Sequence, residues 1–174
     1  MVDSTRKAVH DCAIRQCCAI YCQSKTVDAE SIVALAGSGA KVEIKGEASN
    51  WTSVAIRRPG SQLVLARTVF TGPGFSGPQG RFNSAVLGAG NYFKNVKTAD
   101  VTTRKKLVAD ISRTETLIGC VAKPRMAEGD YGIIFEIARR FGGMIFDSDA
   151  MLDADGVVLL DADGKQGYHR ERDA

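Results

Sequence analysis

Four of the five cysteines lie close together near the amino terminus, where a group of thiols could hold a metal ion or act as a redox centre. They form the pattern C-x4-C-C-x3-C at Cys12, Cys17, Cys18 and Cys22. Apolar residues recurring at three- and four-residue steps predict a helix over residues 4–23. One helix cannot wrap four thiolates around a single ion, because zinc sites need ligands that converge tetrahedrally. We therefore expect buried packing thiols and no cofactor. A metal or thiol protein is the third of three functional alternatives.

Aspartates form a second group that could bind a cation. Six fall within residues 147–163, and Leu-Asp-Ala-Asp-Gly occurs at 152–156 and again at 160–164. An EF-hand loop starting at Asp153 would need a glutamate at its twelfth position, where Gly164 stands. Asp-Gly pairs are typical of tight turns at strand ends. The pattern therefore predicts two turns and an acidic rim rather than a metal site. The candidate binding residues of this rim are Asp147, Asp149, Asp153 and Asp155.

A glycine- and proline-rich stretch covers residues 71–80, and residues 72–77 match G-x-G-x-x-G. Pro73 and Pro78 remove backbone donors where a pyrophosphate would lie, and no acidic ribose-binding residue follows a strand at the right distance. We interpret the stretch as a mobile surface loop that takes part in recognition. Polar residues nearby could assemble a site from distant parts of the chain, which is the second alternative, an enzyme. These candidates are Arg67, Arg81, Asn83, Asn91 and Tyr92.

Catalytic constellations are sparse elsewhere. The two histidines are His10 and His169, and neither lies in a nucleophile motif. Cys120 lies in an apolar run that would stabilise a thiolate poorly. No catalytic residue is therefore predicted. The net charge of +3 favours neither a nucleic-acid nor a membrane partner.

The elements that must position these groups follow from periodicity and turn residues. Helices are expected over 4–23, about 28–35, about 82–96 and about 102–113, with Asp28 or Thr26 capping the second. A three-stranded meander is expected from alternation at 41–45, from 51–56 and from 62–70. Pro59-Gly60 provides the turn between its last two strands.

The carboxyl-terminal half predicts a strand, a helix, a strand and a hairpin. The strand covers Leu117 to Ala122, the helix Tyr131 to Phe141 with Asp130 as cap, and the next strand Met144 to Phe146. The two strands should run parallel if they join one sheet. The hairpin closes at Asp155-Gly156, and a polar tail over 165–174 is expected to fray.

These elements predict one α+β domain with a mixed, largely antiparallel sheet and packed helices. We expect amino-terminal helices over about 4–36 and the sheet with its helices over 40–161, without a linker long enough to divide the chain. No run of about 20 apolar residues is present, as a membrane span would need. Without a signal-peptide pattern, the odd number of cysteines indicates reduced thiols in the cytoplasm.

Several segments resemble a loosely defined group of bacterial cytoplasmic proteins whose activity is uncharacterised. The resemblance covers about residues 80–161 and rests on Asn91 to Phe93, Ile118 to Pro124, Gly142 to Asp147 and Leu152 to Asp161. In that group a strand ending in G-V-V-A-x-P leads through a helix to G-x-I-F and L-D-x-x-G-x-x-L. This chain departs from the pattern at Lys123, where an acidic residue is expected. The resemblance implies a fold and transfers no catalytic residue.

The leading functional expectation is a non-enzymatic interaction factor, of accessory or immunity type, that binds another protein. An acidic hairpin at 147–163 and the loop at 71–80 suit electrostatic docking better than chemistry. The sequence specifies neither the partner nor the oligomeric state.

Overall fold

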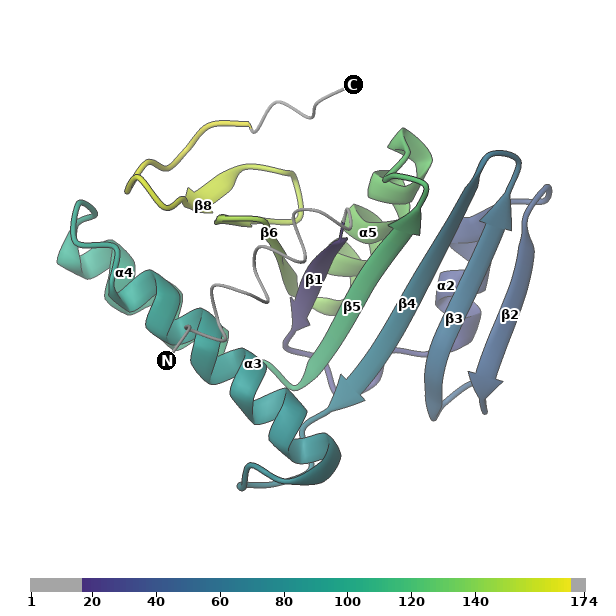
Figure 1. The fold of residues 1–174 in the computed structure, drawn as a ribbon, viewed down its shortest axis with the longest axis horizontal. Coiled ribbons are helices and arrows are strands. Elements are labelled where there is room, and N and C mark those ends of the chain that lie inside the picture. Colours follow the sequence, from purple (N-terminus) through teal and green to yellow (C-terminus); the bar gives the residue numbers. More distant parts are fainter. Residues whose placement is uncertain (1–16, 170–174) are drawn as a thin grey trace.

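The computed structural model describes residues 17–169 and shows an α+β fold built on one eight-stranded antiparallel sheet. The strands are β1 (Cys17–Cys22), β2 (Lys41–Gly46), β3 (Trp51–Arg58), β4 (Ser61–Val69), β5 (Thr116–Lys123), β6 (Gly143–Asp147), β7 (Ala150–Leu152) and β8 (Val158–Leu160). The helices are α2 (Ala29–Ala36), α3 (Gly77–Lys94), α4 (Val101–Ser112) and α5 (Glu128–Phe141). Figure 1 shows their arrangement.

The sheet order is β2-β3-β4-β5-β1-β6-β7-β8, and each neighbouring pair is antiparallel. The predicted meander is confirmed as β2-β3-β4, and Pro59-Gly60 joins β3 to β4 with Gly60 at φ +80°. Both β5 and β6 pair antiparallel with β1, which lies between them. The two strands that flank α5 therefore run parallel, as expected, although no pair of adjacent strands does.

The prediction of a helix over 4–23 is wrong for residues 17–22, which form β1 at the centre of the sheet. Residues 4–16 lie outside the described part of the chain. A central strand is apolar on both faces, so it shows no strict alternation. A short apolar run of this kind cannot be distinguished from a helical segment by periodicity alone.

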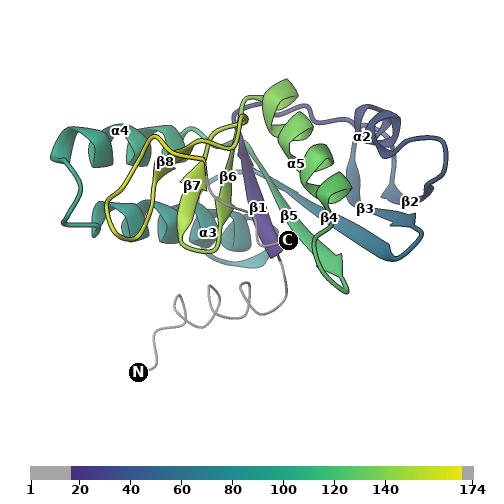
Figure 2. The same cartoon turned by 90° about the horizontal axis from the view of Figure 1, so that it is seen from above.

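The two faces of β1 join two different cores. Cys18, Ile20 and Cys22 pack with α2 and α5, whereas Tyr21 packs with α3 and α4 on the opposite face. Seen from above in Figure 2, α2 and α5 lie along one side of the strands. Antiparallel sheets are often covered on one face only. Here the second cover reaches just one end of the sheet, because the α3–α4 core draws its strand residues from β1 and β5 to β8.

Helices α2 and α4 each begin at an aspartate whose side chain accepts from the backbone. Asp28 caps α2 as predicted, since its carboxylate accepts from the amide of Ser31 at 2.7 Å. Hydrogen bonds from the amide and the hydroxyl of Ser31 lower the pKa of Asp28. Asp100 caps α4, because its carboxylate accepts from the amide of Thr103 at 3.1 Å.

The carboxyl-terminal tail is also held more firmly than expected. Residues 165–169 turn back beside β8, where the amide of Val158 donates to Tyr168 and the amide of Gly167 donates to Val158, both at 2.8 Å. The prediction of a frayed tail is wrong for residues 165–169, and residues 170–174 lie outside the description. This pairing could not be predicted from the polar composition of the tail, because main-chain groups make these hydrogen bonds.

Candidate functional site

The connection from β4 to α3, residues 70–76, presents large apolar side chains to solvent on a constrained backbone. We call it the Phe75 loop. The exposed fraction of Phe75 is 70% and that of Phe70 is 41%. Exposed aromatic side chains of this size are uncommon in clusters and often mark interaction sites.

The backbone of the Phe75 loop is fixed by the first two turns of α3. The side-chain amide of Asn83 donates to the carbonyl of Gly72 at 2.9 Å and to that of Gly74 at 2.8 Å. Gly80 packs so closely on the backbone of Phe75 that a Cβ at residue 80 would clash with it. Asn83, one of the candidate residues, therefore positions the loop.

The expected flexible loop over 71–80 is shorter than predicted, because residues 77–80 form the first turn of α3. Ser76 precedes the helix and Pro78 lies in its first turn, where a missing amide donor costs no helical hydrogen bond. Phe70 packs on the buried ring of Phe82, with centroids 5.8 Å apart. Phe75 is thus the more solvent-exposed aromatic of the loop.

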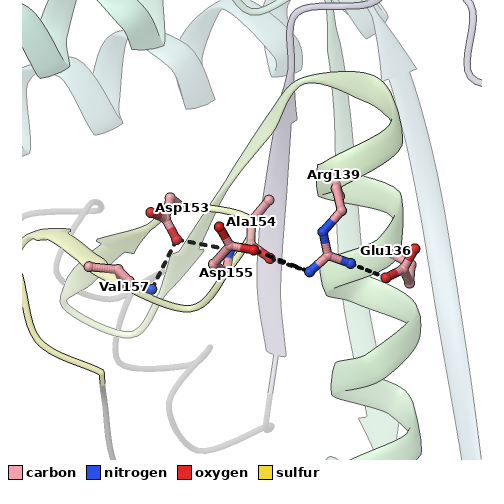
Figure 3. A network of polar contacts seen from close by, with 6 residues as sticks. All are labelled: Glu136, Arg139, Asp153, Ala154, Asp155 and Val157. Carbon is pink, nitrogen blue, oxygen red and sulfur yellow. Dashed lines mark hydrogen bonds and ion pairs between the residues drawn. The ribbon is translucent and has the colours of Figure 1, made fainter.

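The first turn of the aspartate repeat uses its leading carboxylate internally. In Figure 3, one oxygen of Asp153 accepts from the amides of Asp155 and Val157, at 2.9 and 3.0 Å. The main chain closes the same turn, because the amide of Gly156 donates to the carbonyl of Asp153. Gly156 adopts φ +82°, which glycine tolerates without strain.

The second turn repeats this geometry eight residues later. One oxygen of Asp161 accepts from the amides of Asp163 and Lys165, both at 2.9 Å, and the hydroxyl of Tyr168 donates to the other oxygen. Burial opposes the ionisation of Asp161, but the hydrogen bonds from Tyr168, Lys165 and Asp163 lower its pKa below the usual value. The repeat therefore encodes two matching turns.

The remaining acidic candidates are only partly available to a partner. Arg139 on α5 binds both Glu136 and Asp155, so it links the helix to the hairpin tip (Figure 3). The side chain of Asp155 is nevertheless 74% exposed. Asp147 and Asp149 are half-buried and each makes further interactions. The acidic rim thus presents fewer uncommitted carboxylates than the sequence indicates.

Arg67 fastens the sheet rather than pointing toward the Phe75 loop. Its guanidinium donates to the carbonyl of Trp51 at 2.9 Å and lies 5.6 Å from the centroid of the Trp51 ring. The indole nitrogen of Trp51 in turn donates to Val27 at 2.6 Å. Partial burial lowers the pKa of Arg67, and the alternation of β4 puts its side chain on the face of Leu65, toward α2 and α5.

The other candidates of the enzyme alternative lie along α3. Tyr92 packs on Phe146, with ring centroids 5.6 Å apart, and its hydroxyl donates to the carbonyl of Asp149 at 3.4 Å. Arg81 and Asn91 are exposed on the outer side of this helix. Because Arg67 and Tyr92 belong to opposite faces of the sheet, the structure does not bring this candidate set together.

The described thiols lie in the core. Cys18 faces Cys120 directly across β1 and β5, and both pack with Cys22 in the α2–α5 core. Burial raises the pKa of Cys22 to about 12 and that of Cys120 well above its usual range. Among the side chains that the structure describes in residues 18–169, no group of three or more histidines, cysteines, aspartates or glutamates is placed to hold a metal ion. Cys12 and the side chain of Cys17 lie outside this description.

Phe70 and Phe75 are the residues that sequence reasoning missed. Aromatic residues in or beside a glycine- and proline-rich stretch could have indicated exposed apolar side chains there. Such a stretch has too few other apolar side chains to bury them.

No helix within residues 17–169 combines the length and the apolarity needed to cross a membrane. No family model, curated protein or solved structure matches the chain. The function must therefore be inferred from the geometry of the chain itself.

Proposed function

We propose that this protein is a non-enzymatic interaction factor of the bacterial cytoplasm, of accessory or immunity type, that binds another protein through the Phe75 loop. The observation that carries the proposal is the exposed Phe75 on a backbone held by Asn83 and Gly80. Large aromatic side chains are frequent centres of binding energy at protein interfaces.

The constrained backbone supports this proposal energetically. A loop that already has its bound shape loses little conformational entropy when a partner binds, so more of the contact energy appears as affinity. Arg81 lies one turn into α3 and is exposed. Beside an aromatic anchor, such a cation suits a partner pocket that has a carboxylate at its rim.

The acidic hairpin has a smaller role in this proposal than the sequence suggests. Asp153 and Asp161 are occupied by their own turns. Asp155 and Asp163 remain exposed, and charges at the rim of an interface mainly affect association rate and salt dependence.

The test is a pull-down from native extract with matched variants of the full chain. Phe75→Ala should lose the captured partner, with at least about tenfold weaker binding, because it removes the anchor. Leu87→Ala is the control, since Leu87 is 52% exposed on α3 but lies outside the loop. Asn83→Ala should weaken capture by releasing the loop. Unchanged capture by Phe75→Ala, or no captured partner at any salt concentration, would contradict the proposal.

A further inference from the structure

The edge of the sheet at β2 has no strand partner within the described chain. β2 pairs with β3 on one side, and it is the last strand at that end of the sheet (Figure 1). An edge strand presents a row of backbone donors and acceptors on which a further strand can form. β2 spans six residues, enough to pair with a short extended segment.

One face of β2 carries alternating charges. Lys41, Glu43 and Lys45 are all exposed, and they lie on the side of the sheet away from α2. The register places Arg57 of β3 opposite Lys41, and Arg57 lies 3.7 Å from Glu43. The pair neutralises the one anion, so the two lysines give this face a positive charge.

The other face of β2 is apolar and lies on the α2 side. Val42 is partly buried against the α2–α5 core, whereas Ile44 remains 38% exposed. An apolar side chain on an added strand would cover Ile44, because directly opposite residues in an antiparallel pair have neighbouring side chains.

The symmetric pairing of two copies of this chain that is centred on Glu43 is disfavoured at this edge. If two β2 strands paired antiparallel about Glu43, each Lys41 would face a Lys45 and the two Glu43 side chains would face each other. Like charges directly opposite destabilise a strand pair, and edge lysines commonly prevent self-pairing in this way. The same lysines would attract a strand of opposite charge.

We propose that β2 accepts an extended, acidic segment of another protein as a ninth strand. The segment carries carboxylates opposite Lys41 and Lys45 and apolar side chains opposite Val42 and Ile44. In this mode main-chain hydrogen bonds provide affinity and the alternating side chains provide selectivity. The inference is independent of the Phe75 loop. A nucleic acid lacks the peptide groups that would complete the edge.

The experiment uses the full chain and two labelled five-residue peptides, read by fluorescence anisotropy. The acidic peptide has glutamate at positions one and five, valine at two and four and serine at three, a pattern that fits in either strand direction. The basic peptide has lysine in place of glutamate. The native chain should prefer the acidic peptide by at least about tenfold.

The double variant Lys41→Glu with Lys45→Glu should reverse this preference, because it reverses the charges at the edge. The matched control is Lys105→Glu with Lys106→Glu, a double charge reversal on α4, which should leave it unchanged. Hydrogen exchange should show new protection of the amides of residues 41–46 when the acidic peptide binds.

No anisotropy change, equal binding of both peptides, or protection away from residues 41–46 would overturn the proposal. So would concentration-dependent self-association in sedimentation that the Lys41→Glu with Lys45→Glu variant alters, since the occupant would then be a second copy. Phe75→Ala should bind the acidic peptide normally, so failure at this edge is distinguishable from failure of the Phe75 loop.

Discussion

Asp153 and Asp161 show how far residue types alone can be interpreted. Both sit at the first position of a turn and both accept from two main-chain amides. The eight-residue repeat was sufficient to predict these turns, because Asp-Gly pairs favour them. It did not indicate that Asp161 would be 6% exposed and bound to Tyr168, since that contact depends on a tail expected to fray.

The two turns make matched substitutions possible. Asp161→Ala should lower the free energy of unfolding by about 2 kcal/mol, because the amides of Asp163 and Lys165 and the hydroxyl of Tyr168 lose a buried acceptor. Asp153→Ala should cost about 1 kcal/mol or less, because Asp153 is half-buried and water can replace the lost contacts. Urea unfolding at pH 7 measures both values, and equal costs would contradict the burial argument.

The lowered pKa of Asp161 adds a pH dependence. A carboxylate whose pKa is lower in the folded state contributes its stability above the unfolded pKa of about 4 and loses it as pH falls through the folded value. The difference in unfolding free energy between the native chain and Asp161→Ala should therefore be constant from about pH 5 to 7 and shrink below about pH 4. A difference that grows as the pH falls would exclude this origin.

At the scale of elements, alternation and turn residues predicted most strands, whereas the central strand β1 was missed. The alternation of β2 and the Pro59-Gly60 turn located the meander, and the pattern of α5 located its inner face. In β1, Cys18, Ile20, Tyr21 and Cys22 are buried and no polar residue alternates with them, so the period of this segment was ambiguous. α3 starts at Gly77 because Pro78 suits a first turn, although glycine and proline together indicated a loop.

One ion pair joins two of these elements. Arg58 at the end of β3 binds Asp130 in the first turn of α5, and Asp130 is fully buried. The second oxygen of Asp130 accepts from the amide of Ala127 at 2.8 Å. Both groups lie far apart in the sequence, so their pairing could not be predicted from spacing.

Removing the cation should destabilise the fold, because it leaves the buried carboxylate without its partner. We expect Arg58→Met to lower the unfolding free energy by about 3 kcal/mol. Arg57→Met is the matched control, because Arg57 makes an exposed pair with Glu43 at 3.7 Å and should cost at most about 0.5 kcal/mol. Urea unfolding compares the two variants. Similar costs would show that the Arg58–Asp130 pair does not hold the β3–β4 hairpin to α5.

At the scale of the whole molecule, the fold class followed from local patterns but the strand order did not. β1 lies between β5 and β6, and this arrangement depends on contacts between residues about 100 positions apart, such as Cys18 with Cys120. Sequence periodicity reports which side of an element is buried and not which strand lies beside it. The glycine and proline content located the Phe75 loop. Its shape was not predicted, because Asn83 and Gly80 fix the loop through tertiary contacts.

The central place of β1 makes thiol reactivity a measure of global unfolding. Cys18, Cys22 and Cys120 are at most 3% exposed, and burial raises the pKa of Cys22 to about 12. Because the thiolate is the reactive form, these three cysteines should react with a disulfide reagent only through unfolding.

In the variant Cys12→Ser with Cys17→Ser, we expect no rapidly reacting thiol in the native protein and three in denaturant. The reaction rate of the native protein should rise with urea concentration. A shift from pH 7 to about 9 should accelerate the denatured protein far more than the native one, because an ordinary thiol ionises near pH 8.5. Rapid reaction of any of the three thiols in the native variant would mean that the sheet centre opens locally, and that these cysteines are available for redox chemistry.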